Sequence, residues 1–105
     1  MNENVTINEV QNDGRSIHLY FNGLIGLWSA YGISAFILSK VTTVSASYSE
    51  NMQMPVVVMI SAHLDEMKKQ LEVVRQGKGY CCLAVEEAID EEAYSEWASQ
   101  LRMSR

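Results

Sequence analysis

The side chains best suited to catalysis or metal binding are scattered along this chain of 105 residues. His18 and His63 are far apart in the sequence, and neither stands at the spacing of a metal site or a catalytic triad. Cys81 and Cys82 are adjacent, whereas zinc and thioredoxin motifs require separated cysteines. We therefore expect two small apolar residues in a strand, no catalytic residue, no metal site, no cofactor and no enzymatic activity.

Two charged segments near the end of the chain also lack the pattern of a ligand site. Gly77, Lys78 and Gly79 do not form a phosphate loop, because the first glycine and the serine or threonine of that motif are missing. Five carboxylates lie between positions 86 and 92 without the spacing of an EF-hand. Since they precede a predicted helix, attraction to the positive end of its dipole explains them.

The acidic balance of the sequence bears on the class of partner. A net charge of −5 argues against a protein whose main task is to grip nucleic-acid phosphates, although it leaves room for a local basic face. The length and the 48% of apolar residues fit one domain over residues 1–105 with a single core. The cysteines do not demand an oxidising compartment, so we expect a cytoplasmic protein.

Residues 17–39 carry no formal charge and suit either a membrane span or the strand, turn and helix of a small α/β domain. Gly23, Gly26 and Gly32 disfavour one long helix, and no cluster of Lys or Arg flanks the segment to orient it. We therefore expect an α/β domain without a membrane partner. A small membrane-associated protein built on residues 24–39 is the third alternative.

Alternating apolar residues predict strands in the first part of the chain. Val5 and Ile7 indicate a short first strand, which a turn at residues 12–14 would pair with a second strand. In that second strand Ile17, Leu19 and Phe21 would face the core.

Apolar residues at three- and four-residue steps predict three helices further along. We expect one over residues 30–41 with Ser29 as its N-cap, and one with Ser61 as its N-cap that ends at Gly77. The acidic residues 86–92 lead into a final helix, whose apolar side holds Ile89, Ala93, Trp97 and Leu101. Residues 56–60 are typical of a central strand covered on both faces, and residues 79–85 of another buried strand. The predicted fold class is α/β, with a mixed, partly parallel β-sheet flanked by about three helices.

Placed in this order, the segments resemble domain I of MutS proteins, the N-terminal mismatch-recognition domain. The stretch LWSAYGISA at positions 27–35 is similar to the family's strand-to-helix junction. Residues 54–63 resemble its strand that begins with Met-Pro and leads to a histidine, and residues 71–77 resemble the end of its next helix. Residues 80–87 resemble its cysteine-containing strand. The resemblance covers about residues 19–87 and rests on shared order and spacing.

The resemblance implies a divergent, stand-alone domain of the MutS domain I-like fold, with altered or lost mismatch readout. In that family a Phe at the junction stacks on a mismatched base and a Glu two residues later hydrogen-bonds to it. Those positions here hold Leu27 and Ser29, so the reading pair is absent. Leu27 would act as an apolar wedge and Trp28 as a stacking ring. The ATPase that drives MutS proteins has no counterpart in this chain.

The predicted function is therefore a non-catalytic, DNA-associated binding module related to mismatch repair, with double-stranded DNA as its partner. Basic residues on and after the second amphipathic helix would contact phosphates. The predicted DNA-binding residues are Leu27, Trp28, Ser29, Tyr31, Lys68, Lys69, Arg75 and Lys78.

The alternative is a protein–protein interaction domain that retains the fold without binding nucleic acid. The acidic balance, the single-domain length and Ser29 in place of the Glu favour it. Leu27 and Trp28 would then be core residues, and the basic residues would belong to a solvated surface. The partner would be another protein or further copies of this chain in a homo-oligomer.

Overall fold

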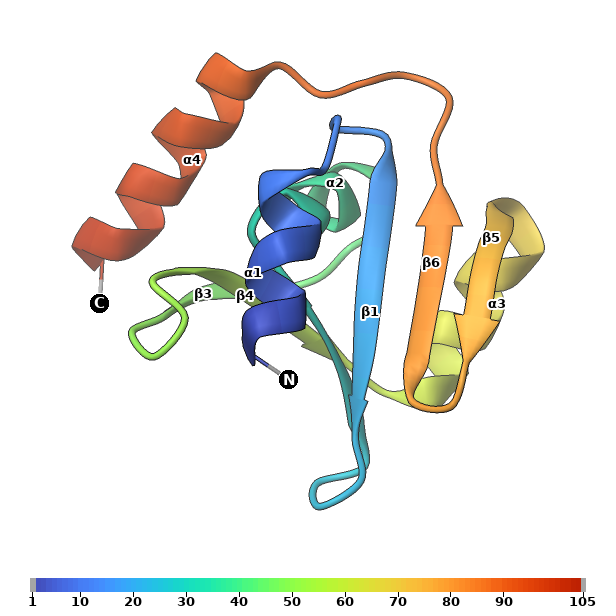
Figure 1. Ribbon diagram of the computed structural model, residues 1–105. Coiled ribbons are helices and arrows are strands. Elements are labelled where there is room, and N and C mark those ends of the chain that lie inside the picture. The colour runs from blue at the N-terminus through green and yellow to red at the C-terminus, as the bar shows by residue number, and fades with distance from the viewer. Residues whose placement is uncertain (1, 105) are drawn as a thin grey trace.

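The computed structural model describes residues 2–104, which form six strands and four helices (Figure 1). The strands are β1 (Ser16–Asn22), β2 (Leu27–Tyr31), β3 (Ala46–Ser49), β4 (Met54–Met59), β5 (Glu72–Gly77) and β6 (Tyr80–Ala84). The helices are α1 (Asn2–Val10), α2 (Gly32–Val41), α3 (Ser61–Gln70) and α4 (Glu91–Ser104).

All six strands belong to one sheet in the order β3-β4-β2-β1-β6-β5, and every neighbouring pair is antiparallel. The predicted fold class, a partly parallel sheet with about three helices, is therefore wrong: the sheet is antiparallel and residues 2–104 contain four helices.

The two helical crossovers explain why the order of strands and helices in the sequence led to the wrong prediction of parallel strands. Helix α2 connects β2 to β3, and α3 connects β4 to β5; within each pair the two strands run in the same direction. Such crossovers normally place parallel strands side by side. Here β4 lies between β2 and β3, and three strands lie between β4 and β5. Each crossover therefore passes over antiparallel neighbours.

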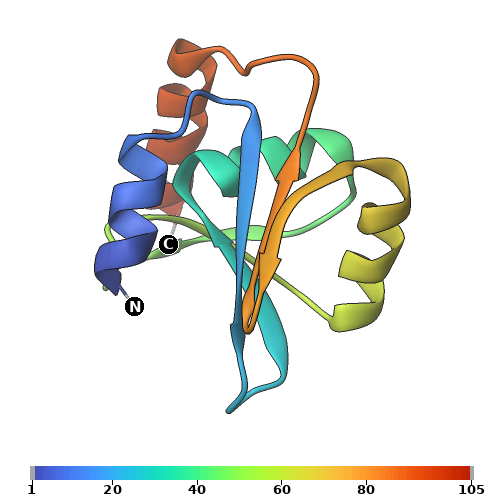
Figure 2. The same cartoon turned by 45° about the vertical axis from the view of Figure 1, so that its right-hand side comes forward.

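The core lies on one face of the sheet, beneath α2 and α3. Ile17 and Leu19 of β1 and Leu83 of β6 are fully buried on this face, as the predicted alternation of β1 requires. Leu64 and Met67 of α3 belong to the same cluster. Helix α1 lies in front of the sheet in Figure 1, with α2 behind it, and turning the molecule brings α3 forward beside β5 (Figure 2).

The first predicted strand is a helix, α1. Val5 and Glu9, one helical turn apart, are both buried, whereas Ile7 and Val10 are exposed. A strand would have put Val5, Ile7 and Glu9 on one side. Because the segment is helical, the turn at residues 12–14 joins a helix to a strand and not two strands of a hairpin.

Helix α2 begins three residues later than the predicted N-cap. Ser29 lies within β2, paired with Tyr20 and Val58, and is therefore not a cap. The N-cap residue is Tyr31, whose side chain makes no capping hydrogen bond. The free N–H of Ser34 in the first turn donates instead to Oε1 of Glu9, at 2.9 Å.

The second amphipathic helix is shorter than its periodicity predicts. Helix α3 ends at Gln70, and Val74 lies in the edge strand β5, all of whose residues are exposed. Strand β4 also differs from the prediction, because Val58 is half exposed and only one face of this strand is covered. Strand β6 and the final helix α4 are confirmed, with Glu91 and Glu92 in the first turn of α4 and Arg102 in the last.

No helix within residues 2–104 has both the length and the apolar character needed to cross a bilayer.

Candidate functional site

The junction residues Trp28 and Ser29, predicted to contact DNA, point to opposite faces of the sheet. The Trp28 ring packs against Phe21 at 5.2 Å between centroids, and its Nε1 donates to Oγ of Ser61 at 3.2 Å. Ser29 is buried on the other face. The two side chains therefore do not reach the same base.

Leu27 and Tyr31 lie at the two ends of β2. Leu27 follows the β1–β2 turn and is partly exposed, whereas the Tyr31 ring lies 6.4 Å from that of Tyr20. Four of the predicted contacts are thus spread along and across one strand.

The predicted basic residues surround the edge strand β5 without sharing one face. Arg75 pairs with Cys82 in the sheet, on the face that carries His18 and Tyr80. Lys68 and Lys69 lie in the last turn of α3, on the opposite side of the sheet, where Lys69 forms an ion pair with Glu66 at 3.2 Å. Lys78 lies in the β5–β6 turn.

A surface that the sequence did not single out is the β1–β2 turn, residues 23–26, which projects from the sheet in Figure 1. Leu24 is 97% exposed and Ile25 58% exposed. Asn22 fixes the turn, since its Oδ1 accepts from the N–H of Leu24 and its carbonyl from the N–H of Gly26. Gly26 has φ +69°, which favours glycine. The turn therefore presents two aliphatic side chains in a fixed geometry.

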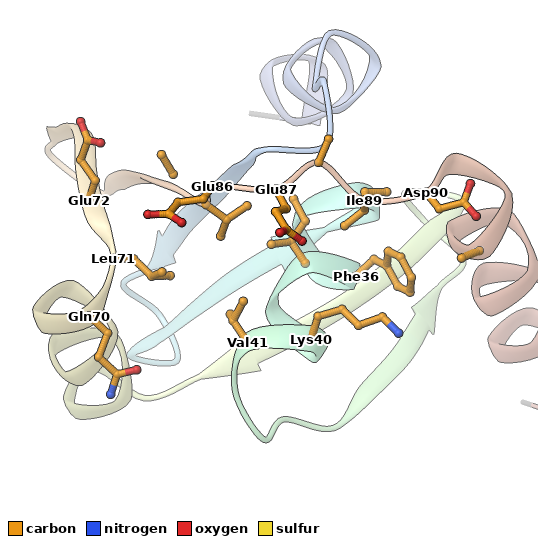
Figure 3. A pocket seen from close by; sticks show the side chains of 15 residues that line it. Phe36, Lys40, Val41, Gln70, Leu71, Glu72, Glu86, Glu87, Ile89 and Asp90 are labelled. Carbon is orange, nitrogen blue, oxygen red and sulfur yellow. The ribbon is translucent and has the colours of Figure 1, made fainter.

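A second surface missed by the sequence analysis is a groove of about 840 Å³, which we call the α2–α4 groove (Figure 3). Apolar residues from α2, the junction of α3 and β5, the end of β6 and the loop before α4 form its floor. They include Phe36, Ile37, Val41, Leu71, Val85 and Ile89. These residues come from three separate segments of the chain, so their proximity depends on the sheet topology.

Carboxylates dominate the rim of the α2–α4 groove. Glu72 stands at the start of β5, and Glu86 and Glu87 lie on the loop after β6. In Figure 3 the side chain of Glu87 lies at the groove, between Val41 and the loop backbone. Among residues 2–104 the cation of the lining is Lys40, whose Nζ lies 5.0 Å from the centroid of the Phe36 ring.

The buried carboxylate of Glu9 has a structural explanation. Its Oε1 accepts from the N–H of Ser34 and its Oε2 from the hydroxyl of Ser34, at 2.9 and 2.6 Å. Burial raises the pKa of Glu9 above its usual value, partly offset by these hydrogen bonds. The carboxyl group therefore replaces the missing cap of α2 from another helix.

The partly buried polar face of the sheet holds His18 and Tyr80, with Nδ1 and the phenol oxygen 2.7 Å apart. Burial, with a smaller contribution from Arg75, lowers the pKa of His18, and burial raises that of Tyr80 to about 12. Both groups are therefore neutral at pH 7. Burial also raises the pKa of the Cys82 thiol, which keeps it protonated. The phenol of Tyr80 and the thiol of Cys82 are therefore not activated nucleophiles.

Metal binding has no obvious location either. In residues 2–104 no three His, Cys, Asp or Glu side chains gather closely enough to hold an ion. His63 contacts Thr42 through Nε2 at 2.9 Å and so links the end of α2 to α3.

Comparison with known proteins adds no family to these observations. No protein-family model, no curated protein and no solved structure matches this chain. The relation to MutS domain I therefore stays a prediction from the sequence, and the two surfaces described above carry the functional argument.

Proposed function

We propose that this chain is a non-catalytic protein-interaction domain that binds a segment of a partner protein in the α2–α4 groove. The observation that carries the proposal is the groove itself, which has a volume of about 840 Å³ and a floor on which the aliphatic residues Val41, Leu71, Val85 and Ile89 are at least partly exposed. Volumes of about 300–1,000 Å³ are typical of sites that enclose a ligand. A cytoplasmic location is part of this proposal.

The make-up of the groove favours a protein segment over DNA. Val41 is 39% exposed, and Leu71 and Ile89 are partly exposed beside it, so aliphatic side chains of a partner gain burial there. Duplex DNA would instead bring phosphates toward Glu86 and Glu87, where like charges repel.

Selection from a displayed random-peptide library tests the proposal. The binding site of enriched peptides is mapped by amide chemical shifts of the full chain. We expect shifts at the groove, and we expect Val41→Asp to weaken binding at least tenfold because it places a charge on the floor. Val10→Asp is the matched control, since Val10 is 80% exposed on α1, away from the groove. Peptides that bind elsewhere, or that tolerate Val41→Asp, would refute the proposal.

DNA binding is the second candidate function, and the β1–β2 turn favours it. Leu24 and Ile25 are exposed aliphatic residues on a fixed turn, the kind of wedge that minor-groove proteins insert between bases. Lys78 lies in the neighbouring β5–β6 turn, whose Gly79 carbonyl accepts from the N–H of Phe21. The resemblance to MutS domain I belongs to this candidate.

A gel-shift experiment with matched and mismatched duplexes, at low and raised salt, tests the second candidate. Binding through the turn would be lost in a Leu24→Ser, Ile25→Ser double variant and kept in Val10→Ser. Because both turn residues face solvent, the double variant keeps the fold. Absence of a shifted band even at low salt would exclude DNA binding.

A further inference from the structure

We infer that the segment bound in the α2–α4 groove is cationic: a short stretch of a partner protein with aliphatic residues for the floor and Lys or Arg for the rim. This inference rests on the proposed function and adds the chemistry of the partner to it. Its basis is the distribution of charge around an apolar floor.

The carboxylates of Glu86 and Glu87 are not explained by the fold. Both are exposed, and neither forms a hydrogen bond or an ion pair with any residue in the range 2–104. They come four and five residues before α4 begins, too far to act on its first turn. That role belongs to Asp90, whose Oδ1 accepts from the N–H of Glu92 at 3.1 Å, and to Glu91.

Two adjacent carboxylates beside an apolar floor repel each other, and a bound cation removes the repulsion. Guanidinium and ammonium groups supply the charge at the rim while their methylene stems cover aliphatic surface. A segment that alternates aliphatic and basic residues therefore matches both parts of the groove.

The two ends of the groove differ in charge, because Lys40 lies at one of them. Its Nζ lies against the Phe36 ring, near α4, whereas Glu72 and Glu86 lie toward β5 (Figure 3). A bound segment consequently places its basic residues at the β5 side, because at the α4 side the charges of Lys40 and Asp90 offset each other.

Three acetylated and amidated nine-residue peptides test the inference. They share one leucine pattern and carry Arg, Gln or Glu at the remaining positions. Amide chemical-shift titration of the full chain at low salt gives the affinity and the location. We expect the Arg peptide to shift Val41, Leu71 and Ile89, and the Gln peptide to bind about tenfold more weakly, since each exposed ion pair contributes modestly. The Glu peptide should not bind.

Variants separate a specific site from general attraction to an acidic protein. Glu86→Gln with Glu87→Gln should weaken binding of the Arg peptide about tenfold and reduce its dependence on salt. The matched control is Glu91→Gln with Glu92→Gln, which makes the same change of charge on α4 outside the groove. Equal weakening by both pairs would overturn the inference, because the attraction would then be general.

The remaining outcomes distinguish this inference from the proposed function. If the Gln peptide binds the groove as tightly as the Arg peptide, the cationic partner is refuted while the protein-binding groove stands. If the Arg peptide shifts no groove residue at millimolar concentration, the inference fails, and the library selection decides separately whether the groove binds protein. Loss of binding in Val41→Asp with retention in Val10→Asp supports both.

Discussion

Glu9 shows how one side chain can replace the local signal that normally starts a helix. Its carboxyl group reaches the first turn of α2 from a position 25 residues earlier and accepts hydrogen bonds from both the N–H and the hydroxyl of Ser34. Local capping rules therefore favoured Ser29, which lies next to the helix in sequence but inside β2 in the fold. A capping partner so far away leaves no trace in the sequence around α2.

The raised pKa of Glu9 predicts a specific pH dependence. Between its ordinary value of 4.5 and the higher value in the folded chain, the folded state holds a proton that the unfolded state has released. The contribution of Glu9 to the free energy of unfolding is therefore present below pH 4.5 and is lost as the pH rises through the folded pKa. Subtracting the Glu9→Gln curve from the wild-type curve, in urea unfolding across pH 4–8, should show this fall.

Urea unfolding also measures how much the cap formed by Glu9 stabilises the fold. Glu9→Ala should lower the free energy of unfolding by about 1–2 kcal/mol, the usual effect of removing a cap, whereas Glu9→Gln keeps an acceptor. A pH-independent difference between wild type and Glu9→Gln would mean that the carboxyl titrates alike in both states.

At the level of elements, strands that carry core residues could be predicted, whereas the edge strand β5 could not. Strands β1 and β6 were found from alternating or continuous apolar residues, because both carry core residues. Strand β5 was assigned to a helix, since its exposed Val74 happened to continue the spacing of α3. The α2–α4 groove could not be predicted, because it depends on which segments the sheet brings together.

Helix α4 packs two aromatic rings against α2. It has no fully buried residue, and its Trp97 and Tyr94 rings lie 5.0 and 5.8 Å from the ring of Phe36 on α2. Trp97→Ala should lower the free energy of unfolding by about 2 kcal/mol, less than for a fully buried Trp. Hydrogen exchange of α4 amides should rise more than that of β1 amides. Met103→Ala, an exposed change on the same helix, is the control and should have no effect.

In the whole molecule, the order of the sheet makes β6, a late strand, a direct neighbour of the early strand β1. Strand β1 lies between β2 and β6, and His18 and Tyr80 are 62 residues apart in sequence. A chain that stops at residue 79 lacks β6 and should not fold, whereas one that stops at residue 90 keeps all six strands and should unfold cooperatively at a lower temperature. Circular dichroism melts compare the two. Cooperative unfolding of the shorter chain would contradict the central role of β6.

The place of β6 beside β1 has a consequence for synthesis in the cell. A ribosome releases β1 and β2 early, but β6, the second neighbour of β1, is made only after α2, β3, β4, α3 and β5. Until then the backbone N–H and C=O groups along the open edge of β1 lack their strand partner. Nascent chains of this protein should thus depend on chaperone protection until β6 has been released.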